Sequence, residues 1–239
     1  MTVVAPDGDR SGVAHALSIH HPVRVREVRD RGVRTFSCSG TPADCVVVGS
    51  YELLDAPPDL VVSGINRGAN AGDDITYSGT IAAANEALLV GVPSIAVSLV
   101  VSWPVSTEVP QWESAARCAV DLAREIDALA LPSTTLLNIN VPNLASHELR
   151  GVKWTKQARK RYRDRTDRRV DPRGETYVWI WGSQTDMAIE EGSDLAALRD
   201  GYASVTPISI DRTDEVTLDR LREDRGDGPS VCGGRGSSF

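Results

Sequence analysis

Residues 58–98 read PDLVVSGINRGANAGDDITYSGTIAAANEALLVGVPSIAVS, and this stretch decides the fold. The apolar run at 59–66 predicts a buried strand, and it leads into a loop rich in glycine and asparagine. A helix is expected over residues 79–90, and residues 93–99 predict a second strand. Strands and helices that alternate at this spacing are typical of a parallel sheet covered by helices.

The same alternation continues on both sides of this stretch. Residues 2–6 are a short apolar run that predicts a buried strand. Thr41 is a good capping residue followed by a proline, and it predicts a helix that ends near residue 54. Further on, apolar residues three and four positions apart predict an amphipathic helix over 111–130, and residues 136–141 predict the next strand. We therefore expect an α/β fold with a mostly parallel sheet.

The segment after Gly151 differs in character from the part before it. Residues 152–157 and 176–181 resemble strands, and a polar, basic stretch separates them. We interpret the segment at about 152–182 as a β-arm that packs on a neighbouring subunit.

The last part of the chain returns to the α/β pattern, with a helix expected at 194–199 and a strand at 203–210. We therefore predict one α/β domain over residues 1–225. Glycine and serine are frequent in residues 226–239, and this composition predicts a disordered tail.

Composition and charge limit the classes of function. The net charge is −7 at pH 7, which disfavours a general nucleic-acid-binding role, because such proteins have a basic balance. The most apolar window, residues 81–103, is interrupted by polar residues and by Pro93, so no membrane span is expected. The first residues lack the pattern of a targeting segment, and the four cysteines form no CxxC pair. We expect a cytoplasmic protein.

The loop at residues 63–80 carries the strongest functional signal. Its glycines allow the backbone to approach a ligand closely. Asn66 stands at the carboxyl end of a predicted strand, where its carbonyl oxygen could bind a hard cation such as Mg²⁺. Ser78, Gly79 and Thr80 open a helix, and the unpaired backbone N–H groups there favour an anion. The alternative is a glycine- and asparagine-rich turn followed by an ordinary helix cap.

A second polar loop, APDGDRSG at residues 5–12, follows the predicted strand at the start of the chain. Ser11 in this loop should face the same edge of the sheet as Asn66, because parallel strands end at the same edge. A single serine in a loop is usually only a turn residue. The combination with the loop at 63–80 favours a functional role for Ser11.

Six stretches of the sequence resemble the SurE family of 5′/3′-nucleotidases, also called survival-protein phosphatases. Their order along the chain is the order in which they occur in the family. The stretches are VVAPDGDRSGVAHALS at 3–18, GTPADCVVVG at 40–49, residues 58–98 as quoted above, LLNINVP at 136–142, DPRGETYVWIWG at 171–182 and GSDLAALRDGYASVTPISID at 192–211.

The resemblance implies a Rossmann-like α/β fold and a divalent metal, with Mg²⁺ or Mn²⁺ as the first candidates. It implies hydrolysis of nucleoside 5′- and 3′-monophosphates and of other phosphomonoesters. By the same resemblance, Ser11 and Asn66 bind the metal, while Asn70 and the turn at 78–80 face the phosphate. The β-arm is implied to reach across to another subunit, so a homodimer or homotetramer is expected.

The sequence departs from the family near its start. Family members have a strand, an NDDG turn and a helix before the VVAP strand, and the two metal-binding aspartates lie in that turn. Asp7 and Asp9 lie in the later loop with Ser11, so they do not match these aspartates by position. Asp73 and Asp74 match an aspartate pair that the family has in the same loop. We therefore expect the βα unit and both metal-binding aspartates to be missing from this chain, and the catalytic residues stay unassigned.

Three alternatives remain open. Without the aspartates, the chain could be a non-catalytic subunit that binds nucleotide or assembles with other subunits. The attacking nucleophile of the enzyme could be water or an aspartate. A serine hydrolase that uses Ser11 or Ser78 is disfavoured, because the chain has no GxSxG motif, and His15 is expected to have only a supporting role.

The basic stretch at residues 156–169 has eight Lys or Arg residues and two Asp residues. Such a stretch usually forms a solvated loop. The alternative is that it gathers anionic substrates, including long polyphosphate, at the mouth of the site.

Overall fold

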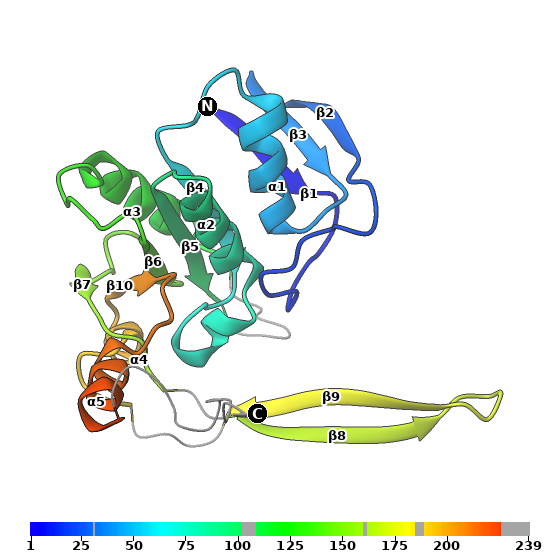
Figure 1. The fold of residues 1–239 in the computed structure, drawn as a ribbon. Helices are drawn as coiled ribbons and strands as arrows, with labels where there is room; N and C mark the ends of the chain where they lie inside the picture. The colour runs from blue at the N-terminus through cyan, green and yellow to red at the C-terminus, as the bar shows by residue number, and fades with distance from the viewer. Residues whose placement is uncertain (31, 102–108, 160–161, 185–188, 226–239) are drawn as a thin grey trace, which may run out of the picture.

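The computed structural model describes residues 1–30, 32–101, 109–159, 162–184 and 189–225 (Figure 1). In these residues the strands form a five-stranded sheet, a three-stranded sheet and a two-stranded hairpin. The predicted tail at 226–239 lies outside the described residues. That residues 1–225 form one domain stays a prediction.

The five-stranded sheet has the strand order β4-β5-β6-β10-β7. The first three strands are parallel, and β10 runs antiparallel to β6 and parallel to β7. The expected α/β fold is confirmed, although the β6–β10 pair makes the sheet mixed. The strands are β4 (Val61–Arg67), β5 (Ser94–Val100), β6 (Thr135–Pro142), β10 (Ala203–Ser209) and β7 (Val152–Trp154).

Two helices cover opposite faces of this sheet. Each packs on a different set of side chains, since successive side chains of a strand point to opposite faces. α2 (Gly79–Leu89) packs on the face that bears Ala96 and Leu136. α3 (Trp112–Glu125) packs on the other face, against side chains such as Ile139. α3 is shorter than the helix expected over 111–130, because residues 126–130 form turns. No described helix is long and apolar enough to cross a membrane.

The three-stranded sheet has the order β1-β3-β2. β1 (Thr2–Pro6) is parallel to β3 (Val33–Cys38), and β2 (Val25–Asp30) is antiparallel to β3. The sequence predicts β1 but not the other two strands. β2 has four charged residues out of six, β3 mixes polar and apolar residues, and each strand is only six residues long, so their sequence signal is weak.

Helix α1 (Pro42–Val48) begins as the sequence predicts. The Thr41 hydroxyl accepts a hydrogen bond from the Asp44 backbone N–H, and the Asp44 carboxylate accepts one from the Thr41 N–H. This reciprocal pair satisfies two N–H groups that have no partner within the helix. A π-helical turn, η1 (Gly49–Leu53), continues α1, so the helical segment ends close to the predicted position.

The predicted β-arm is a hairpin of β8 (Tyr162–Val170) and β9 (Thr176–Gln184), which extends away from the sheets (Figure 1). The arm does not begin at residue 152 as expected, because β7 pairs with β10 in the five-stranded sheet. Most of the basic stretch at 156–169, which was expected to be a loop, belongs to β8. Cross-strand pairing with the aromatic and β-branched residues of β9 overrides the low strand propensity of its charged residues.

The remaining elements follow the arm or lie in the loop after β4. α4 (Asp194–Arg199) occupies the residues predicted for it. α5 (Glu215–Arg225) was not predicted, because its sequence is rich in charge and lacks an apolar stripe. A short 3₁₀ helix, η2 (Gly72–Thr76), lies between β4 and α2.

Candidate functional site

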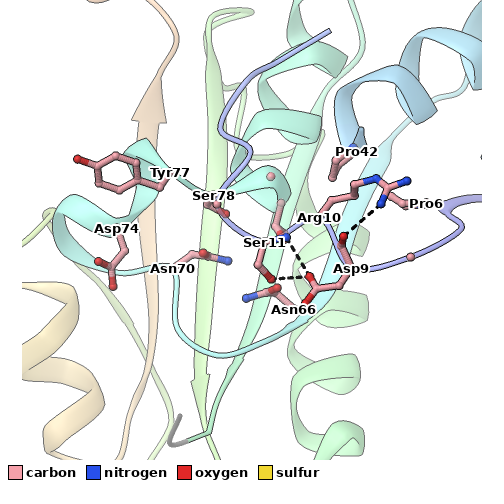
Figure 2. A pocket seen from close by; sticks show the side chains of 14 residues that line it. Pro6, Asp9, Arg10, Ser11, Pro42, Asn66, Asn70, Asp74, Tyr77 and Ser78 are labelled. Carbon is pink, nitrogen blue, oxygen red and sulfur yellow. Dashed lines mark hydrogen bonds between the residues drawn. The ribbon is translucent and has the colours of Figure 1, made fainter. Parts of the chain in front are cut away.

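A pocket of about 390 Å³ lies where the loop after β1 meets the loop between β4 and α2 (Figure 2). This volume is in the range of small-molecule binding sites. The pocket brings together all the residues to which the sequence analysis gave a role in the site. These are Ser11, Asn66, Asn70, Ser78, Gly79 and Thr80.

Ser11 is held in place by Asp9. One carboxylate oxygen of Asp9 accepts hydrogen bonds from the Ser11 hydroxyl at 2.6 Å and from the Ser11 backbone N–H at 2.9 Å. These bonds lower the pKa of Asp9, the hydroxyl bond having the larger effect, so this carboxylate stays charged. Arg10 fixes the same loop to the end of β3, because its guanidinium donates to the carbonyl oxygens of Ser39 and Gly40.

Asn66 lies at the end of β4 beside Ser11 and Asp9 (Figure 2). Its side-chain N–H donates to the carbonyl oxygen of Gly68 at 2.9 Å, and this bond sets the orientation of the amide. β4 has an irregularity just before Asn66, at Gly64, where φ is 131°. A Cβ atom at Gly64 would collide with the carbonyl oxygen of Val97, so glycine is required for β4 to bring Asn66 to this position.

Asn70 is buried and held by a network of hydrogen bonds beneath the pocket. Its backbone N–H donates to Asn140 Oδ1 at 2.7 Å, and its carbonyl oxygen accepts from the side chains of Asn138 and Asn140. Asn70 Nδ2 donates one hydrogen to Ser98 Oγ at 2.7 Å. The same nitrogen lies on the side of the amide toward Ser11 (Figure 2), so its second hydrogen is placed to reach a ligand oxygen.

Ser78 is the N-cap of α2, and its hydroxyl oxygen accepts a hydrogen bond from the backbone N–H of Ile81. The N–H groups of Gly79 and Thr80 are in the first turn, where a helix offers no internal acceptor. The Gly79 Cα lies so close to α1 that a Cβ atom would be 2.9 Å from the Pro42 ring. Glycine therefore lets the start of α2 sit next to α1, with its positive end toward the pocket.

Oxygen atoms dominate the part of the pocket around Ser11. The Ser11 hydroxyl, the Asn66 amide oxygen and the Asp9 carboxylate are hard donors, which suit Mg²⁺ or Mn²⁺. Mg²⁺ usually takes one or two carboxylates together with water and phosphate oxygens, so these groups fit part of a coordination shell. Within the described parts of the chain, no group of three or more His, Cys, Asp or Glu side chains is arranged to hold a metal ion.

Some pocket residues were not identified from the sequence. Asp9 was not among the predicted site residues, and the structure places its carboxylate against Ser11. Asp74 and Tyr77 line the end of the pocket away from Ser11, and Tyr77 is 62% exposed (Figure 2). Both lie in the loop at 63–80. The resemblance matched Asp74 to an aspartate pair of the family without a metal role, and Tyr77 has no residue type that marks a phosphate or metal site. His15 is not a lining residue, and its ring contacts Glu86 on α2 at 2.7 Å.

Comparison with known proteins gives a consistent family assignment. The family model of survival protein SurE matches residues 1–164. A protein of Syntrophotalea carbinolica named 5′-nucleotidase SurE is 48% identical over 213 residues, which are 89% of this chain and 82% of the relative. A protein of Geobacter sulfurreducens with the same name is 47% identical over 222 residues, 93% of this chain and 82% of the relative. The crystal structure of the SurE protein from Aquifex aeolicus has a TM-score of 0.76 and 39% identity, and the match covers 92% of this chain and 86% of that one.

Proposed function

We propose that this chain, which belongs to the SurE family, is a phosphomonoesterase that hydrolyses nucleoside 5′-monophosphates to nucleoside and phosphate. The observation that carries the proposal is one pocket in which the N-terminus of α2 lies opposite the oxygen donors of Ser11 and Asn66. Such a pocket offers donors to an anion on one side and ligands to a cation on the other. Relatives named 5′-nucleotidase SurE support the choice of substrate.

The residues of the chain bind and orient the phosphate in this proposal. The backbone N–H groups of Gly79 and Thr80 and the amide of Asn70 donate to its non-bridging oxygens. Because these donors are fixed by α2 and by the network of buried asparagines, they stabilise the negative charge that shifts onto those oxygens during hydrolysis. No described histidine lines the pocket, so proton transfer is assigned to water or to a carboxylate.

We further propose that the enzyme requires Mg²⁺ or Mn²⁺, held by Ser11 and Asn66. When bound there, a divalent ion supplies neutralising charge and Lewis acidity next to the phosphoryl group. Ser11 is suited to this role because Asp9 accepts the hydroxyl hydrogen, which leaves the lone pairs of Oγ for a cation. The 3′-monophosphates belong to the same proposal, because the contacts it assigns to Asn70, Gly79 and Thr80 are with the phosphate alone.

Phosphate release from AMP tests these proposals. The assay measures phosphate release by this chain with Mg²⁺ or Mn²⁺ and with EDTA. We expect release with Mg²⁺ or Mn²⁺ and none with EDTA. Release that EDTA does not affect would contradict the metal requirement. No release with either ion would favour a non-catalytic, nucleotide-binding subunit.

The quaternary structure is part of the proposed function. A hairpin of two strands is at most marginally stable in water when nothing covers it. β9 exposes apolar side chains on both faces, among them Trp179 on one face and Ile180 on the other. We propose that a second copy of the chain covers the arm, which gives a homodimer or homotetramer.

Long polyphosphate is a further candidate substrate. The Arg159 side chain is largely exposed at the root of the arm, and its guanidinium lies 3.5 Å from the Asp73 carboxylate in the loop at 63–80. A cation at this place would attract the remote phosphates of a long substrate while the terminal phosphate occupies the pocket. Arg161, Arg163 and Arg165 have side chains outside the described set, while Arg168 and Arg169 are exposed on β8.

A further inference from the structure

Asp194, the first residue of α4, is a buried carboxylate without a place in the proposed mechanism. Its side chain is 1% exposed. One of its oxygens accepts hydrogen bonds from the backbone N–H groups of Leu195 at 2.7 Å and Ala158 at 3.0 Å. The other accepts one from the backbone N–H of Gly72 at 2.8 Å. A buried carboxylate is costly unless it is fully hydrogen-bonded, so these contacts hold three segments together.

The three segments come from different parts of the molecule. Gly72 begins η2, which leads to the pocket residues Asp74 and Tyr77. Ala158 lies at the root of the arm, four residues before β8. Leu195 belongs to α4. Asp194 therefore joins the wall of the pocket to the root of the arm.

A neighbouring side chain reinforces this connection. Gln157 Nε2 donates to the carbonyl oxygen of Gly72 at 3.1 Å and reaches Asp73 Oδ1 at 3.4 Å. Both backbone polar groups of Gly72 are thus bonded to groups outside its own loop. Glycine has no side chain to fix its position, and its φ of 59° is reached easily only by glycine. The placement of the wall after Gly72 depends on these partners.

We propose that Asp194 is a positioning residue that fixes the pocket wall at residues 72–77 relative to the root of the arm. The two ends of this wall have other attachments: Asn70 is bound to Asn140, and the Tyr77 carbonyl oxygen accepts from the Ala14 N–H. Between them, Gly72 is bonded to Asp194 and Gln157, and the Asp73 side chain lies near Arg159. The arm reaches the pocket through this carboxylate, so the arm's position affects how tightly the pocket holds its ligand.

Asp194→Asn is a selective test because it keeps the shape of the side chain. The amide oxygen replaces the carboxylate oxygen that serves Ala158 and Leu195. The amide NH₂ then faces the Gly72 N–H, so that one bond is lost. Ser193→Ala is the matched control: Ser193 is also buried and caps α4 by accepting from the Ala196 N–H, but it does not bond to Gly72.

The direct measurement is amide hydrogen exchange in peptides that cover residues 70–78. We expect exchange about tenfold faster in Asp194→Asn than in the unmodified chain, because a hydrogen bond to a charged group is lost, and unchanged exchange in Ser193→Ala. Unchanged exchange in Asp194→Asn, or equal acceleration in both variants, would overturn the proposal. If Asp194→Asn does not fold, Gln157→Leu, at a partly exposed position, decides by the same readout.

The consequence for catalysis rests on the proposed function and has a separate readout. In the chain supplied with Mg²⁺ or Mn²⁺ we expect Asp194→Asn to raise KM for AMP about fivefold and to change kcat less than twofold, because the pocket wall moves while Asn70 and α2 stay in place. Ser193→Ala should keep both values. Faster exchange with an unchanged KM would overturn the link between Asp194 and the pocket. If no chain releases phosphate, the proposed function fails, while hydrogen exchange still decides the role of Asp194.

Discussion

Single residues in the pocket are oriented by partners that lie below or beside it. Asn70 is the clearest case, since its backbone and one hydrogen of its amide are bound to Asn138, Asn140 and Ser98. These partners leave one amide hydrogen toward the pocket. The role of Asn70 as a phosphate donor can therefore be separated from its role in the fold.

Asn70→Asp tests this separation. The aspartate keeps the backbone contacts and can accept a hydrogen bond from Ser98, but it loses the donor and adds a negative charge next to the phosphate. We expect kcat for AMP in the active chain to fall by about 100- to 1000-fold, the usual effect of removing one donor to developing charge. The melting temperature is the control. Activity within threefold of the unmodified enzyme would contradict a contact between Asn70 and the phosphate.

Asp44 gives a prediction for the dependence of stability on pH. Burial raises the pKa of Asp44, but hydrogen bonds from Ser18 and Thr41 together lower it more, so the folded-state pKa lies below the ordinary value. Because the pKa is lowered, the charged Asp44 carboxylate stabilises the folded state fully above about pH 3.9. This contribution disappears as the pH falls through the folded-state pKa. Urea unfolding of the unmodified chain and of Asp44→Asn, from neutral pH down to about pH 2, measures the contribution of Asp44 to the free energy of unfolding. The difference in unfolding free energy between the two chains should be constant near neutral pH and shrink in acid. A difference in unfolding free energy that does not depend on pH would contradict the lowered pKa of Asp44.

At the scale of elements, the arm depends on contacts outside its own two strands. β8 is rich in charge and β9 is apolar, so their pairing leaves β9 side chains without cover in one copy of the chain. Trp179→Ser should weaken self-association about 30-fold or more, because a buried tryptophan at an interface commonly contributes over 2 kcal/mol. Light scattering over a range of concentrations measures it, with Tyr51→Ser, an exposed aromatic residue outside the arm, as the control. Equal molar mass for the unmodified chain and Trp179→Ser down to the lowest concentration would contradict the proposed interface.

The root of the arm carries the prediction on polyphosphate. Arg159→Ser should raise KM for long polyphosphate several-fold at low salt and leave KM for AMP nearly unchanged, because only the long substrate extends to this position. Arg173→Ser, in the turn at the tip of the arm, is the matched loss of charge far from the root. An unchanged KM for polyphosphate at low salt in Arg159→Ser would reject the idea, and so would equal effects of both variants.

For the molecule as a whole, the sequence predicts the elements that have a strong local pattern. The strands that lead to Ser11 and Asn66 are apolar runs followed by glycine-rich loops, and such runs predict both the sheet and the edge at which the site lies. The charged strands β2 and β8 have no such pattern, since their stability comes from the strands with which they pair. Local sequence does not carry that information.

Contacts between distant segments explain what the sequence did not predict in the site. Gly72 and Asp194 are 122 residues apart in the chain, and Asn70 and Asn138 are 68 apart. Nothing in the local sequence connects them, although asparagines inside the apolar strand at 136–142 are a sign of buried polar contacts. Asp9 was set aside because its loop follows a later strand, and only the folded chain places it against Ser11.

The central claim is that this pocket binds the phosphate of a nucleoside monophosphate, and an amide NMR titration with AMP and Mg²⁺ tests it most directly. We expect chemical-shift changes that saturate at the backbone N–H groups of Gly79 and Thr80 and at the side-chain NH₂ of Asn70, the groups that line the pocket. Adenosine, which lacks the phosphate, should leave these signals in place. No change at these three groups with AMP, or equal changes with adenosine, would contradict the account.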